Sequence, residues 1–269
     1  MQYLIAVDLE GIHGVVGEPN KTLTDSFDYK DAVDGAILEI NTVAAALFDN
    51  GAGSVAVWDN HGSGKNIDFS LLDPRVERID TTGNKYRFDF VKDYDFKGII
   101  YLGYHAKEGA FGGVLAHTYS SKAFQYMKIN GVAVGELTID SYICESHGIP
   151  PIFAAADDVA LGEITEIYPN IITVTTKYGK GRNSAELRES KTVLDEIRHK
   201  VVTAAVRKAP ECAKKFESPS ELEVRFTRAE RAADSFERAK KMGIPVRYGE
   251  DSHILFYEVT TPQQIIKVV

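Results

Sequence analysis

Short apolar runs rich in β-branched and aromatic residues alternate with helical patterns along the first two-thirds of the chain. The runs lie at residues 3–7, 54–58, 98–102 and 151–155. Between the first two, residues 31–50 have one apolar helical face, which Gly51 brings to an end. Strands that alternate with crossover helices are typical of α/β proteins. We therefore expect a three-layer α/β/α fold with a largely parallel sheet.

The last third of the chain has a different texture. Three elements are predicted before residue 177: a tight turn at Asn130-Gly131, a helix at residues 137–147 and a strand at 171–176. A basic, glycine-rich stretch follows at residues 177–182. We interpret this stretch as a loop. The segments beyond it are predicted as a helix at 184–208, a strand at 222–227, a helix at 229–242, a strand at 246–259 and a short helix beginning at Thr261-Pro262.

These patterns suggest an α/β domain at residues 1–178 and a smaller α+β subdomain at residues 179–269. The boundary is soft, and the two parts can also form one continuous domain.

The composition is that of an ordinary globular protein, with 44% hydrophobic and 26% charged residues among 269. A net charge of -8 argues against nucleic-acid binding, which normally needs a basic face. Charged residues interrupt the first apolar run before it could form a signal peptide or a membrane span. We therefore expect a cytoplasmic protein without a membrane partner. With only Cys144 and Cys212 available, any metal must be held by histidines and carboxylates.

Two carboxylates stand at the end of the first apolar run. Asp8 and Glu10 are two positions apart, so the period of a strand would send both to the same face. Buried anions this close repel each other, and a bound cation is the simplest remedy. Two solvated side chains at a strand end are the alternative. Gly11 and Gly14 would allow a close backbone approach beside such a site.

Two histidines follow the next two strands. His61 comes directly after the second apolar run and His105 after the third. In open α/β sheets the carboxyl ends of the strands converge on one crevice, where these histidines can meet Asp8 and Glu10. A lone histidine more often has a structural role than a ligand role. Two histidines in equivalent positions after strands of the same sheet are less easily explained by chance. Imidazole and carboxylate ligands suit zinc, with manganese or cobalt as substitutes.

Further candidates lie outside these strand ends. Glu136 stands at a predicted helix start, where the helix dipole alone favours a carboxylate, so the pattern by itself favours a structural role. His117 lies in a glycine-containing loop, which is a reasonable carrier for a proton-transfer group, although an ordinary exposed histidine is the alternative. The basic residues Lys180 and Arg182 could meet a substrate carboxylate, but a solvated loop is the better interpretation.

The order of these motifs resembles a known family, the self-compartmentalising zinc D-aminopeptidases associated with bacterial dipeptide-transport operons. The resemblance rests on Val7-Asp8-Leu9-Glu10-Gly11, Asp59-Asn60-His61, Gly103-Tyr104-His105-Ala106, His117 and Val134-Gly135-Glu136-Leu137. It implies that Asp8 bridges two zinc ions, that Glu10 and His105 complete one centre and His61 and Glu136 the other, and that His117 acts in catalysis. The family forms a decamer around a chamber and releases the amino-terminal residue from short peptides, notably D-alanyl ones.

The sequence thus predicts a cytoplasmic metallo-aminopeptidase with two zinc ions per subunit, short peptides as substrates and a homodecameric assembly. The sequence leaves two alternative functions. One is a two-metal phosphoesterase, because clustered Asp, Glu and His also clamp phosphoryl oxygens. The other is a non-catalytic peptide-binding protein that contains a metal.

Overall fold

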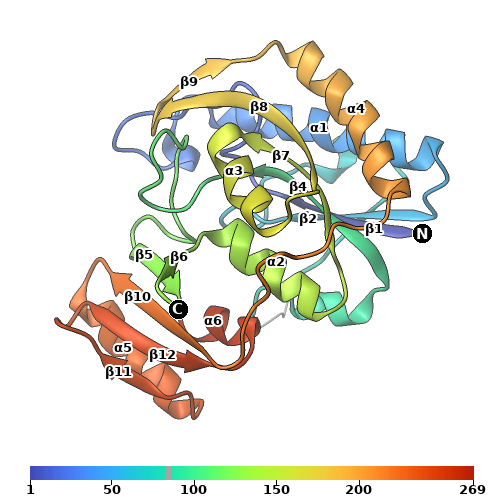
Figure 1. Cartoon of the computed structure of the whole chain (residues 1–269). Helices are drawn as coiled ribbons and strands as arrows, with labels where there is room; N and C mark the ends of the chain where they lie inside the picture. The colour runs from blue at the N-terminus through green and yellow to red at the C-terminus, as the bar shows by residue number, and fades with distance from the viewer. Residues whose placement is uncertain (83–85) are drawn as a thin grey trace.

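The computed structural model describes residues 1–82 and 86–269, and its centre is a seven-stranded sheet (Figure 1). The strand order is β3-β2-β1-β4-β7-β8-β9, and neighbours are parallel except for β8 and β9. The strands are β1 (Gln2–Val7), β2 (Ser54–Asp59), β3 (Val76–Arg78), β4 (Phe96–Tyr104), β7 (Pro151–Asp157), β8 (Ile172–Gly181) and β9 (Ser184–Leu187).

Helices cover both faces of this sheet, which confirms the predicted three-layer α/β/α arrangement. The helices α1 (Tyr29–Asp49) and α4 (Ser190–Val206) pack together on one face, and α2 (Glu136–Ser146) and α3 (Asp158–Ile167) on the other (Figure 1). Alternate residues of β1 serve the two cores: Ile5 packs with the α1 layer, and Leu4 with the α2 layer. Among the described helices, none combines the length and apolarity that a bilayer crossing requires.

A second, five-stranded antiparallel sheet has the order β11-β12-β10-β5-β6. Its elements are β5 (Phe124–Ile129), β6 (Val132–Ala133), β10 (Ser220–Phe226), β11 (Val246–Tyr248) and β12 (Ile254–Val259), with the helices α5 (Ala229–Lys241) and α6 (Pro262–Val268). The hairpin around Asn130-Gly131 therefore joins the C-terminal strands. The suggested boundary between residues 178 and 179 lies inside β8, and the division into two parts stays a prediction.

Three segments differ from the sequence-based expectations. Residues 177–182 do not form a loop, because β8 continues to Gly181 and pairs with β9. The helix predicted from residue 184 begins only at Ser190, since the preceding residues belong to β9. The strand predicted at residues 246–259 is two strands, β11 and β12, which pair with each other as a hairpin.

Candidate metal and catalytic site

The ends of three neighbouring parallel strands bring four of the predicted ligands together. Asp8 and Glu10 follow β1, His61 follows β2 and His105 follows β4. The Nδ1 atom of His61 lies 2.9 Å from Oδ1 of Asp8 and 3.1 Å from Oε2 of Glu10. Both carboxylates are buried. Neither residue lies within β1, so the alternation of side chains along a strand does not bring them together. The loop after β1 orients both carboxylates towards the same space.

Two glycines allow this loop to touch the neighbouring strand. Gly11 donates its amide hydrogen to the carbonyl of Gly103 at 2.7 Å. A Cβ atom on Gly11 would lie 2.0 Å from the carbonyl oxygen of Tyr104, and one on Gly103 would lie 2.1 Å from that of Asp8. Gly103 also has a positive φ of 69°. The close approach that sequence analysis associated with Gly11 is therefore present, and it needs glycine on both sides.

His61 is held by its acidic neighbours. Burial by itself lowers the pKa of His61, but Glu10 and Asp8 outweigh it and raise the pKa of His61 to about 11. Burial likewise opposes ionisation of Asp8, yet His61 and His105 bring the pKa of Asp8 far below its ordinary value. The two carboxylates therefore strongly favour a positive charge beside them, either a protonated imidazole or a metal ion.

His105 is oriented by the backbone. Its Nδ1 atom lies 3.0 Å from the carbonyl oxygen of Ala106, which accepts the Nδ1 hydrogen and leaves Nε2 to face the site. The Nε2 atom lies 3.2 Å from Oε1 of Glu136 and 3.5 Å from Oδ2 of Asp8. It is fully buried and has no hydrogen-bond partner among the described residues. An imidazole nitrogen and two carboxylate oxygens thus converge on one space, as a zinc ion requires.

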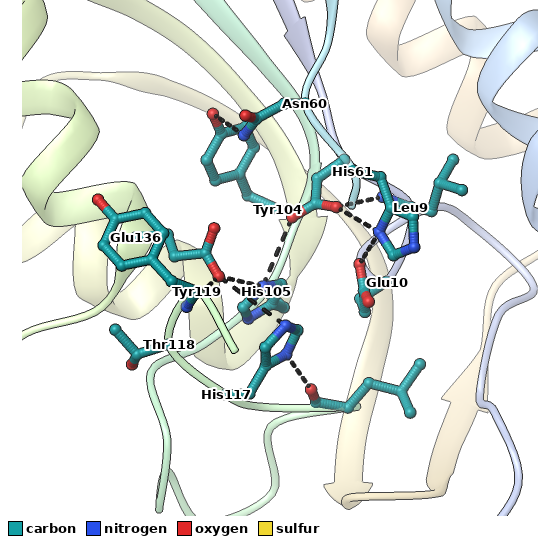
Figure 2. Close-up of polar contacts among 12 residues, drawn as sticks. Leu9, Glu10, Asn60, His61, Tyr104, His105, His117, Thr118, Tyr119 and Glu136 are labelled. Carbon is teal, nitrogen blue, oxygen red and sulfur yellow. Dashed lines mark hydrogen bonds and ion pairs between the residues drawn. The ribbon is translucent and has the colours of Figure 1, made fainter. Parts of the chain in front are cut away.

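Glu136, the first residue of α2, reaches the same space (Figure 2). Its Oε1 atom accepts a hydrogen bond from the backbone of Tyr119 at 2.6 Å and lies 3.8 Å from Nε2 of His117. The structural interpretation of Glu136 as a residue that only begins a helix is therefore incomplete, because its carboxylate is buried against two histidines.

His117 stacks on His105, with ring centroids 3.9 Å apart (Figure 2). Its Nδ1 atom lies 2.8 Å from the carbonyl oxygen of Leu115, so this carbonyl accepts the Nδ1 hydrogen and Nε2 is free to accept a proton. Burial and the neighbouring His105 lower the pKa of His117. A neutral imidazole with an available Nε2 suits a proton-transfer group at neutral pH.

Two overlapping groups of donor atoms could hold metal ions. The first comprises Asp8, Glu10 and His105, and the second comprises His105, His117 and Glu136, with donor atoms within 4.8 Å of one another in each. His61 contacts Asp8 and Glu10. The structure thus brings all six predicted site residues together. It also places His117 among possible ligand atoms, which the sequence did not suggest.

A buried polar network behind Glu136 was missed by sequence analysis. Arg87 donates to Asp140 Oδ2 at 2.8 Å and to Glu136 Oε2 at 3.3 Å, and Tyr104 donates to Asp140 at 2.9 Å. Asp140 lies one helical turn after Glu136, a spacing that could have indicated a shared face. Nothing in the sequence around Arg87 signals its role. The network fixes the carboxylate that faces the two histidines.

The site opens into a cavity of about 250 Å³. Buried acidic residues and His61 line its inner part, and the exposed side chains of Lys122 and Arg182 lie at its rim. Lys180, another basic residue of the predicted loop, instead approaches Glu186 at 3.5 Å. The volume is small enough to suit a short peptide instead of a folded protein.

Comparison with known proteins gives consistent results. A family model described as D-aminopeptidase matches residues 1–248. The chain is 30% identical over 191 residues to a D-aminopeptidase of Bacillus subtilis (strain 168), an alignment that covers 69% of this chain and 67% of that protein.

The fold is also similar to a solved structure, described as the Zn-dependent D-aminopeptidase DppA from Bacillus subtilis, a self-compartmentalizing protease. That match has a TM-score of 0.84 at 24% identity, and covers 100% of this chain and 95% of the other. As the sequence motifs predicted, the chain belongs to the D-aminopeptidase family of peptidases.

Proposed function

We propose that this peptidase is a zinc-dependent aminopeptidase that releases an amino-terminal D-residue from short peptides in a site of two zinc ions. The observation that carries this proposal is the convergence of buried carboxylate oxygens on the Nε2 atom of His105. Zinc is also the metal of the solved structure with a similar fold. Manganese and cobalt accept the same ligand types.

Five residues would hold the two ions: Asp8, Glu10, His61, His105 and Glu136. Asp8 would contribute to both metal positions, because its two oxygens face different histidines, Oδ1 towards His61 and Oδ2 towards His105. When bound, zinc supplies Lewis acidity for the scissile carbonyl and lowers the pKa of water to near neutrality.

His117 would carry the proton in this reaction. Its neutral Nε2 atom faces Glu136 at 3.8 Å, close to the proposed ligands, while Leu115 holds the opposite edge of the ring. From this position His117 can accept a proton from the attacking nucleophile and donate it to the leaving amine. The same nitrogen would also allow direct nucleophilic attack, and the two roles differ in whether an aminoacyl adduct forms on His117.

Metal stoichiometry tests the proposed site. We expect purified protein, stripped with a strong chelator and reloaded, to contain close to two zinc ions per chain by elemental mass spectrometry. Asp8→Ala should lose both ions if Asp8 bridges them, whereas His61→Ala should lose mainly one. Wild-type protein that stays metal-free after incubation with zinc, manganese or cobalt would exclude the proposed site.

Matched substrates test the reaction. We expect zinc-loaded protein to hydrolyse a D-Ala peptide faster than its L-Ala counterpart and to leave nitrophenyl phosphate intact. Turnover of the phosphate ester alone would favour a phosphoesterase. Tight peptide binding without turnover would favour a peptide-binding protein.

We also propose a homodecameric assembly, as the resemblance implies; the solved protein of similar fold is described as self-compartmentalizing. A cytoplasmic location is part of the same proposal. It is supported by the two free thiols of Cys144 and Cys212, because oxidising compartments favour disulfides.

A further inference from the structure

Two cations without acidic partners lie at the rim of the active-site cavity. Lys122 and Arg182 both line the cavity and are exposed. Neither forms an ion pair with an acidic side chain among the described residues, although the chain has a net charge of -8 and many of its other basic side chains are paired. Positive charge left unneutralised beside a catalytic cavity is available to an anionic ligand.

Both residues are held in place by the backbone around the site. The carbonyl of Lys122 accepts a hydrogen bond from the hydroxyl of Thr227 at 2.8 Å, which ties its turn to the second sheet. The carbonyl of Arg182 accepts the amide hydrogen of Leu115 at 2.7 Å, and its guanidinium donates to the carbonyl of Ala116. Arg182 is thereby fixed to the segment that carries His117. The contact of the guanidinium reduces the entropy that the Arg182 side chain loses when a ligand is bound.

The cavity has charges of opposite sign at different depths. Its buried inner part contains the carboxylates of Asp8, Glu10 and Glu136, and its exposed rim contains Lys122 and Arg182. When the amino-terminal residue of a short peptide reaches the inner part, its anionic α-carboxylate lies at the opposite end and can reach the basic rim. The volume of about 250 Å³ also suits a ligand of only a few residues.

We propose that Lys122 and Arg182 bind the free α-carboxylate of the substrate, so that the enzyme selects short peptides with an unmodified carboxyl terminus. The proposal rests on the aminopeptidase function proposed above. The amino-terminal residue lies at the inner part of the cavity, beside the proposed metal ligands, and the carboxylate reaches the basic rim. Amidated or C-terminally extended peptides lose this interaction.

The test compares D-Ala-D-Ala with its C-terminal amide, D-Ala-D-Ala-NH₂, as substrates of the zinc-loaded enzyme. We expect the wild-type kcat/KM to favour the acid over the amide by roughly tenfold or more, the scale of a charge-assisted hydrogen bond. The preference should decrease as salt is added, because the rim is exposed. Lys122→Gln and Arg182→Gln should each bring the ratio closer to one, and Lys122→Glu should make the amide the better substrate.

Lys241→Gln provides the matched control, because Lys241 is an exposed lysine on α5 outside this cavity. It should leave the ratio at the wild-type value. Equal kcat/KM for both peptides, or a preference that survives in both Lys122→Gln and Arg182→Gln, would overturn the inference and leave the aminopeptidase function intact. If neither peptide is hydrolysed, the proposed function fails. Calorimetry then decides on the inference, because equal affinities for the two peptides would refute it.

Discussion

The surroundings of His105 leave one of its ring nitrogens facing two buried carboxylates. The carbonyl of Ala106 accepts the Nδ1 hydrogen, so the Nε2 lone pair faces the oxygens of Glu136 and Asp8. Three acceptor atoms cannot share this buried space without a cation. In the absence of metal, a proton takes that place: burial lowers the pKa of His105, but Glu136 and Asp8 outweigh it and raise the pKa to about 10. Metal and proton therefore compete for the same nitrogen.

This competition predicts a measurable release of protons on zinc binding. We expect both rings of the metal-free protein to be protonated at pH 8, because the neighbouring carboxylates raise the pKa of His61 to about 11 and that of His105 to about 10. Zinc must displace both protons, so we expect about two protons per chain to be released from the ligands at pH 8. Histidines with ordinary pKa values near 6.5 would release almost none.

Calorimetry in two buffers of different protonation enthalpy measures this release. Apparent zinc affinity should increase from pH 7 to pH 9, because fewer protons then compete. His61→Ala should release about one proton fewer. Zinc binding without proton release at pH 8 would show that neither imidazole is charged in the metal-free site.

His117→Ala is expected to lower turnover by roughly two to four powers of ten, the usual scale for a positioned acid or base. The assembly should persist, and metal content should remain close to wild type if His117 only transfers protons. His199→Ala is the matched control, because His199 is exposed on α4. Full turnover would make His117 an ordinary loop residue. Loss of one zinc ion would instead make it a ligand in the group with His105 and Glu136.

Sequence analysis finds site residues that follow strands and misses those that complete the site from elsewhere. His61 and His105 were identifiable because parallel strands end at one edge. Only the family resemblance assigned Glu136 to the site, because the helix dipole alone explains a carboxylate at a helix start. Arg87 had no detectable signal, because its partners Asp140 and Glu136 lie about fifty residues away in the chain.

At the scale of elements, the loop after β1 is positioned by contacts with β4 and β8. Gly11 donates its amide hydrogen to the carbonyl of Gly103 in β4. Lys177 of β8 donates from Nζ to the carbonyl of Glu10 at 2.6 Å and to that of Ile12 at 2.7 Å. Burial lowers the pKa of Lys177 to about 8. This buried lysine thus holds the segment that carries Glu10 in place.

Gly11→Ala tests whether this contact controls the site. The added Cβ would lie 2.0 Å from the carbonyl oxygen of Tyr104, so the loop must move away from β4 and from His105. We expect a loss of about 1–3 kcal/mol in the free energy of unfolding and weaker zinc binding. Urea denaturation and zinc titration measure the two effects.

Gly162→Ala is the matched control, because Gly162 lies in α3 and its Cβ would meet no atom within 4 Å beyond the backbone of its own helix. It should keep zinc affinity and slightly raise stability, since alanine favours helices. Equal behaviour of the two variants would show that the close approach does not position the metal ligands.

The same contacts explain why some elements could be predicted and others could not. The buried parallel strands have continuous apolar runs, and the sequence located them correctly. Residues 177–181 contain two lysines and two glycines, a pattern typical of a loop. They form the end of β8 because they pair with β9, and Lys177 finds carbonyl partners more than 160 residues away. No local pattern encodes such a partner.

At the scale of the whole molecule, the site joins the two sheets. The segment between β4 and β5 carries His117 and Lys122, and it leads from the parallel sheet into the second sheet. Thr227, directly after β10, bonds to the backbone of this segment through Ala123 at 2.9 Å. The C-terminal strands therefore help to position the cavity rim. Activity should depend on the complete chain for this reason.

Two strongly exposed aromatic residues indicate where subunits could make contact. The side chain of Phe111 is 100% exposed and that of Phe27 is 72% exposed in a single chain. Exposed aromatic rings favour burial at a protein contact. Since a decamer is proposed, light scattering should give ten times the 29.7 kDa of one chain. Phe111→Asp should reduce this mass while metal content is retained. A monomeric wild type would refute the decamer without affecting the metal site, whereas an intact decamer in Phe111→Asp would place Phe111 outside the subunit contacts.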